Sequence, residues 1–102
     1  MHIQYITFDT FDKKPTKEDI LKALSDGEDE WFDSFVAEVG FDSGAIAKEI
    51  LEDQYAAWEM YQEDESIYIV VINPNKEDEY HVHRVSVGYV MCASSKFIEI
   101  YN

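Results

Sequence analysis

Positive charge is scarce in this sequence: its 102 residues include eight lysines and arginines, and Arg84 is the single arginine. Against these stand 22 aspartates and glutamates, so the formal net charge at pH 7 is −14. Nucleic acids and anionic membrane surfaces are bound through positive charge. We therefore expect no direct contact with nucleic acid or membrane, and partners that are basic surfaces or cations.

Cysteine and long apolar runs are scarce as well. Cys92 is the only cysteine, which excludes an intramolecular disulfide and a cysteine-based zinc site. The longest apolar run, residues 67–72, is far too short to span a bilayer. The first eight residues lack the positive start and apolar core of a signal peptide. We expect a cytoplasmic protein.

Motifs that carry catalysis are missing. The chain has four glycines and contains no P-loop, Gly-rich phosphate loop, nucleophile elbow, HExxH helix or EF-hand loop. His81 and His83 have a spacing that some metal sites use, but we interpret them as two half-exposed strand histidines. The sequence predicts no enzymatic activity, no cofactor and no specific metal site.

What the sequence has is enough apolar material for one core, with 46% hydrophobic and 15% aromatic residues. We expect a single domain over residues 1–102. Apolar patterns predict strands at residues 3–8, 67–72, 80–91 (bulged near Arg84) and 97–101, and helices at 16–26, 28–39 and 42–62. The predicted fold class is α+β, order β-α-α-α-β-β-β, with three helices packed on a four-stranded, mainly antiparallel sheet.

The helix boundaries rest on local signals. Thr16 and Asp19 have the spacing of a capping box, and Asp42 or Ser43 can cap the third helix. For the second helix the apolar residues follow the i, i+3, i+4, i+7 pattern at Phe32, Phe35, Val36 and Val39. The run 67–72 suits a strand buried on both faces.

The negative charge is concentrated in the centre of the chain. Residues 23–65 contain fourteen acidic residues against a single lysine, Lys48, which gives a net charge of −13. On the predicted third helix, five carboxylates lie opposite the apolar stripe: Glu49, Glu52, Asp53, Glu59 and Glu63. A second patch is predicted in the first turns of the second helix: Glu28, Asp29, Glu30 and Asp33.

The predicted row has a charge density close to that of DNA. At about 1.5 Å per residue it places one carboxylate every ~4–5 Å, against one charge per ~3.4 Å of a DNA strand. Like charges at i, i+4 destabilise a helix slightly, so a solubility coat would intersperse more lysine. The aromatic residues are interpreted as core or core-edge side chains, Tyr55 and Met60 also being candidates for interface anchors: Trp31, Tyr55, Trp58 and Tyr61.

In its charge display and small size, the segment 26–65 resembles the acidic DNA-mimic inhibitors of phages and mobile elements, of anti-restriction and anti-CRISPR type. The resemblance implies a non-catalytic inhibitor that occupies the nucleic-acid-binding cleft of a basic protein, such as a restriction enzyme, a CRISPR effector or a nucleoid protein. It also implies a host-cytoplasmic location if the gene is phage-encoded. No diagnostic motif accompanies it.

Two alternatives stay open. The chain could be an immunity protein or antitoxin that neutralises a cationic nuclease through acid pairing. It could also be an acidic housekeeping adaptor whose charge serves solubility alone. A homodimer would lengthen the acidic surface, and nothing in the sequence requires one.

Overall fold

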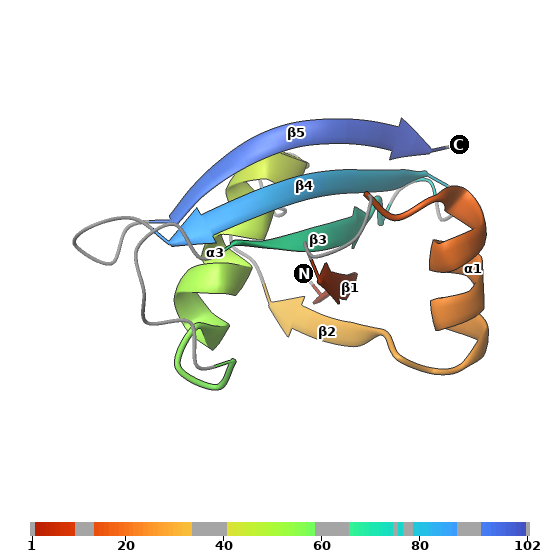
Figure 1. Cartoon of the computed structure of the whole chain (residues 1–102), viewed down its shortest axis with the longest axis horizontal. Helices are drawn as coiled ribbons and strands as arrows, with labels where there is room; N and C mark the ends of the chain where they lie inside the picture. The colour runs from red at the N-terminus through yellow and green to blue at the C-terminus, as the bar shows by residue number, and fades with distance from the viewer. Residues whose placement is uncertain are drawn as a thin grey trace.

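The computed structural model describes residues 2–9, 14–33, 41–58, 66–74, 76, 79–87 and 93–101. The elements are β1 (His2–Asp9), α1 (Lys17–Ser25), β2 (Glu30–Asp33), α3 (Ser43–Gln54), β3 (Ser66–Ile72), β4 (Tyr80–Val87) and β5 (Ala93–Tyr101). The strands form one antiparallel sheet in the order β2-β1-β3-β4-β5 (Figure 1).

The predicted arrangement of three helices on a four-stranded sheet is wrong. In the described part of the chain, two helices accompany a sheet of five strands, in the order β-α-β-α-β-β-β. The difference arises at residues 28–39, where the apolar spacing predicted a helix. Residues Glu30–Asp33 form β2 instead and pair with β1, and 34–39 lie outside the described residues.

Strand pairing explains why β2 is not helical. Without β2, the outer edge of β1 would carry a row of unpaired backbone N–H and C=O groups. The pairing sets Phe32 opposite Ile3, and both side chains pack into the same apolar cluster. Phe32 satisfied the helical spacing and equally satisfies a strand, so the long-range partner decided the local structure.

Helix α1 follows its sequence signals closely. The Thr16 hydroxyl accepts from the Asp19 backbone N–H at 3.2 Å, and the Asp19 carboxylate accepts from the Thr16 N–H at 2.9 Å, which confirms the capping box. Its C-terminus closes as a Schellman motif, with Gly27 N–H donating to the Leu24 carbonyl and Glu28 N–H to that of Ala23. Gly27 has a φ of 74°, a left-handed conformation that glycine adopts without strain.

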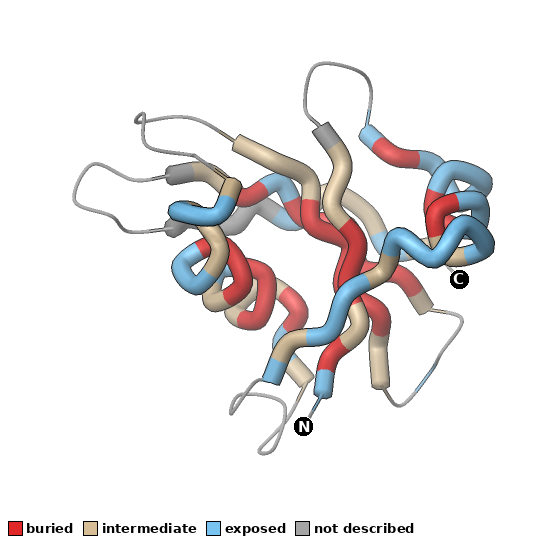
Figure 2. The backbone as a smooth tube through the Cα atoms, turned by 90° about the horizontal axis from the view of Figure 1, so that it is seen from below, coloured by how far each residue is buried: buried red, intermediate tan, exposed pale blue. Residues whose placement is uncertain are grey.

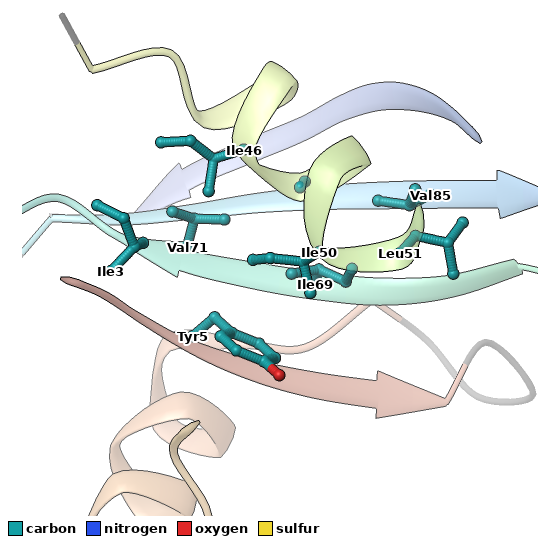
Figure 3. Packing of buried hydrophobic residues seen from close by; sticks show 9 residues of the cluster. Ile3, Tyr5, Ile46, Ile50, Leu51, Ile69, Val71 and Val85 are labelled. Atoms are coloured by element: carbon teal, nitrogen blue, oxygen red, sulfur yellow. The ribbon is translucent and has the colours of Figure 1, made fainter. Parts of the chain in front are cut away.

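The core lies on both faces of the sheet. Successive residues of β3 alternate, so that Ile69 and Val71 pack under α3 while Val70 and Ile72 pack under α1. Figure 3 shows Ile50 and its neighbours on α3 lying over β3 and β4. The buried residues gather in the central strands and on the inner sides of the helices (Figure 2). The prediction that 67–72 is a two-sided strand is confirmed for residues 69–72, which are buried.

Two-sided burial also explains the change of apolar parity in β4. Val82 packs in the cluster under α1, whereas Val85 packs in the cluster under α3. The predicted bulge near Arg84 is not needed for the pairing of β4 with β3, which is continuous. A register shift does occur between Val82 and His83 in the pairing with β5, where Ile98 is the extra residue.

Helix α3 is shorter than predicted. It ends at Gln54 instead of residue 62, residues 55–58 form turns, and 59–62 lie outside the described residues. Asp42 is the N-cap, because its carboxylate accepts from the Ala45 N–H at 3.1 Å. Ser43, the other candidate cap, has its hydroxyl within hydrogen-bond distance of His81 and His83 instead.

Candidate functional site

The predicted row of five carboxylates is not displayed on one helix. Because α3 ends at Gln54, it carries Glu49, Glu52 and Asp53, while Glu59 and Glu63 lie outside the described residues. Glu52 and Asp53 are exposed and Glu49 is half-buried. The helix therefore presents a cluster in its last turns and not a 21-Å row.

The second predicted patch lies on and just before β2. Glu28, Glu30 and Asp33 are exposed, and Asp29 is half-buried. Since side chains alternate along a strand, β2 divides its acids between the two faces of the sheet. Glu30 is opposite Tyr5 on the α3 side, and Asp33 is opposite His2 on the α1 side.

One acid of each group, Glu30 and Asp53, acts on the hydroxyl of Tyr5. This hydroxyl donates to Oε2 of Glu30 at 2.9 Å. Burial, then the hydrogen bond to Glu30, and then the negative charges of Glu30 and Asp53 raise the pKa of Tyr5 well above its usual range. Asp53 therefore lies near enough to act on the same hydroxyl. We call the combined set the acidic edge: Glu28, Asp29, Glu30, Asp33, Glu49, Glu52 and Asp53.

Sequence reasoning missed Tyr5 as the junction of these acids. Nothing in residues 3–8 distinguishes its ring from a core aromatic, and the ring is indeed buried in the α3-side cluster. Only the pairing of β1 with β2 sets the hydroxyl beside Glu30. A phenol is protonated at physiological pH, so the Tyr5 hydroxyl donates to the carboxylate, and the raised pKa extends that state to more alkaline conditions.

The predictions for the aromatic residues have different outcomes. Tyr55 and Trp58 are half-buried against the α3-side cluster, so their assignment to the core edge is confirmed. Trp31 is 62% exposed, so its assignment to the core or core edge is wrong. It lies on the face of β2 opposite to Phe32, which takes the core position. Tyr61 and Met60 lie outside the described residues.

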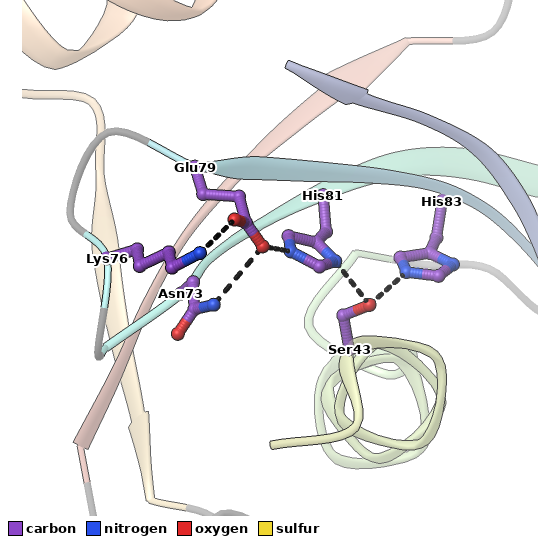
Figure 4. Close-up of polar contacts among 6 residues, drawn as sticks. All are labelled: Ser43, Asn73, Lys76, Glu79, His81 and His83. Carbon is purple, nitrogen blue, oxygen red and sulfur yellow. Dashed lines mark hydrogen bonds and ion pairs between the residues drawn. The ribbon is translucent and has the colours of Figure 1, made fainter. Parts of the chain in front are cut away.

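A second polar group lies buried between α3 and β4 (Figure 4). The Ser43 hydroxyl is 3.0 Å from Nδ1 of His81 and 2.7 Å from Nε2 of His83. Nε2 of His81 is 2.5 Å from the Glu79 carboxylate, which also accepts from the amide of Asn73 at 3.2 Å. Both histidines are buried, so the prediction of half-exposed side chains is wrong.

The carboxylate fixes the direction of the hydrogen bond from His81 and, where both imidazoles are neutral, of the two hydrogen bonds at Ser43. Hydrogen bonding to His81 and Asn73 lowers the pKa of Glu79, so that the group is an ionised acceptor and His81 donates from Nε2. With a neutral imidazole, Nδ1 of His81 then accepts the single proton of Ser43. His83 must in turn donate from Nε2 to the Ser43 oxygen. Every hydrogen bond in this network then has one donor and one acceptor.

This network has a structural role: it joins helix α3 to strand β4. A nucleophilic serine needs an open approach to its oxygen, whereas Ser43 is buried and its hydroxyl is engaged by both imidazoles. Phe41 and Phe97 stand edge-on to His81 and His83, with ring centroids 5.1 and 5.6 Å apart. The network thereby attaches the N-terminus of α3 to the sheet. Its sequence signal was the shared parity of His81, His83 and the core residue Val85.

Among the described residues, no group of three His, Cys, Asp or Glu side chains is placed to hold a metal ion. In the same residues, no helix is both long and apolar enough to cross a membrane. Comparison of the chain with protein-family models, with curated proteins and with solved structures finds no match.

Proposed function

We propose that this protein is a non-catalytic inhibitor that binds a nucleic-acid-binding protein, its carboxylates occupying the positions of backbone phosphates. The observation that supports the proposal is that β2 sets the Glu30 carboxylate 2.9 Å from the Tyr5 hydroxyl on the face of the sheet that α3 covers, and that α3 carries the exposed acids Glu52 and Asp53. Acids from two separate segments of the chain, β2 and the last turns of α3, therefore lie on the same side of the sheet, and a basic groove that reaches both can engage them together.

The mechanism is competition without turnover. Lysine and arginine side chains that line a nucleic-acid cleft donate charge-assisted hydrogen bonds to phosphate oxygens, and carboxylate oxygens accept the same bonds. A net charge of −14 also accelerates encounter with a basic partner. Both effects weaken as salt is added, because exposed charges are screened within about 10 Å at ~0.1 M salt.

Several carboxylates of the acidic edge are held in position before a partner arrives. Glu30 accepts from the Tyr5 hydroxyl, and Asp29 accepts from the Gln4 amide at 2.8 Å. Ordering a side chain during binding costs about 0.5–1.5 kcal/mol. Acids already ordered by the fold avoid part of this cost, which favours a binding role over a freely solvated surface.

The test compares two double variants that remove the same charge from different places. Glu52→Gln with Asp53→Asn acts on the acidic edge, and Glu18→Gln with Asp26→Asn acts on exposed positions at the ends of α1. Each protein is immobilised and exposed at low salt to a lysate of the cells that carry the gene. Circular dichroism checks that both variants keep the fold.

We expect the wild type and the α1 variant to capture nucleic-acid-binding proteins that duplex DNA then elutes. The acidic-edge variant should capture markedly less of the same proteins. Equal capture by the two variants would show that the edge has no special role. A wild-type capture without nucleic-acid-binding proteins would refute the mimicry itself.

A further inference from the structure

The face of the β1–β2 ribbon that points away from α3 carries an exposed indole. Strand register places Gln4 opposite Trp31 and His2 opposite Asp33 on this face. Helix α1 packs over Ile6 further along β1, and Trp31 belongs to β2, the edge strand of the sheet (Figure 1). At 62%, Trp31 is the most exposed of the large hydrophobic side chains among the described residues.

Carboxylates lie on both sides of this indole. Trp31 and Asp33 share a face of β2 at a step of about 6.6 Å, and Asp29 immediately precedes the strand. The Gln4 amide, opposite Trp31, donates to Asp29 at 2.8 Å. Asp33 is 76% exposed and its Oδ1 lies 2.8 Å from Nδ1 of His2.

The indole is also oriented by a neighbour. The His2 ring stands nearly perpendicular to it, at an interplanar angle of 87° and a centroid distance of 6.5 Å. A large aromatic side chain that stays exposed, is flanked by fixed polar groups and has few rotatable bonds is typical of an interface anchor. The surrounding charge selects the chemistry of its partner, because an acidic surface repels an acidic or phosphorylated one.

We propose that Trp31 binds the guanidinium group of an arginine on the partner protein, with the exposed carboxylate of Asp33 accepting its N–H groups. A guanidinium is planar, stacks on an indole and presents a fork of donors to carboxylates. A lysine ammonium is a compact, strongly hydrated charge with no plane to stack. The inference rests on the proposed function, since it names the basic side chain that the acidic edge receives.

The test uses two peptides of equal charge, hexa-arginine and hexa-lysine, and follows the indole N–H signals in proton–nitrogen NMR spectra. The chain has two tryptophans, and Trp31→Phe identifies which signal belongs to Trp31. Trp31→Ala removes the anchor. Phe97→Ala is the matched control, because Phe97 is likewise 55% exposed but lies on β5, at the opposite edge of the sheet.

We expect hexa-arginine to shift the Trp31 signal and to bind about two- to fivefold more tightly than hexa-lysine. Trp31→Ala should abolish that preference, and Phe97→Ala should leave it intact. Equal affinity of the wild type for both peptides, or a preference that survives in Trp31→Ala, would overturn the inference.

The proposed function and the arginine site can be refuted independently. If Trp31→Ala changes nothing while Glu52→Gln with Asp53→Asn loses the captured proteins, the arginine site is wrong and the acidic edge still binds. If the acidic-edge variant also captures as the wild type does, the proposed function is wrong. Peptide binding is measured with the folded full chain, as checked by circular dichroism.

Discussion

Acid should destabilise this protein through His83. Burial, with a smaller repulsion from His81 that Asp42 partly offsets, lowers the pKa of His83 from 6.5 to about 4. The unfolded chain accepts a proton near pH 6.5, whereas the folded protein resists it until about pH 4. The contribution of neutral His83 to the stability of the fold is therefore complete above its unfolded pKa of 6.5 and is lost as the pH falls toward 4.

The magnitude follows from the shift. Each pKa unit corresponds to about 1.4 kcal/mol, so the full effect is about 3 kcal/mol, of which about 2 kcal/mol is lost between about pH 7.5 and about pH 5. Such a loss is large against the 5–15 kcal/mol typical of a domain. Urea unfolding followed by circular dichroism at several pH values measures it.

His83→Gln is the control that separates this effect from the rest of the acid titration. The glutamine amide can donate to the Ser43 oxygen in place of the imidazole N–H, and it does not titrate. Protonation of the many carboxylates changes stability in both proteins alike. The wild type should lose about 2 kcal/mol more than the variant over this range. Parallel pH profiles for the two would refute the assignment.

Two further substitutions test the polar contacts of the fold. Ser43→Ala removes the hydroxyl shared by His81 and His83 and should cost about 1–3 kcal/mol of unfolding free energy, since both buried ring nitrogens lose that partner; an unchanged urea midpoint would contradict this. Tyr5→Phe removes the donor to Glu30 and should cost about 1 kcal/mol in the same assay. It should also weaken partner capture, because the Glu30 carboxylate becomes free to move.

The sequence predicted the elements whose signals are local. The capping box of Thr16 and Asp19 begins α1, and Gly27 ends it, because both depend on backbone groups within a few residues. The run 67–72 predicted a strand buried on both faces, since no polar residue interrupts it. These features need no knowledge of the rest of the fold.

The sequence misled where one pattern suited two structures. Phe32 fits a helical stripe and a strand alike, and the edge of β1 decided in favour of the strand. The assignment of Trp31 to the core or core edge failed with it, because in β2 neighbouring residues point to opposite faces and Phe32 occupies the inner one. His81 and His83 looked like surface residues because their partner Ser43 is 38 residues away from His81 in the chain.

By itself the sequence determined the net charge of −14, the concentration of −13 of it in residues 23–65, and a supply of apolar residues large enough for a folded domain. Charge and hydropathy are sums over residues, so they need no coordinates. Tertiary structure alone decided that Glu30 of β2 and Asp53 of α3 both act on the hydroxyl of Tyr5, and that Trp31 stands exposed beside Asp33. Both depend on which strand pairs with β1, and that pairing depends on hydrogen bonds and side-chain contacts between distant segments.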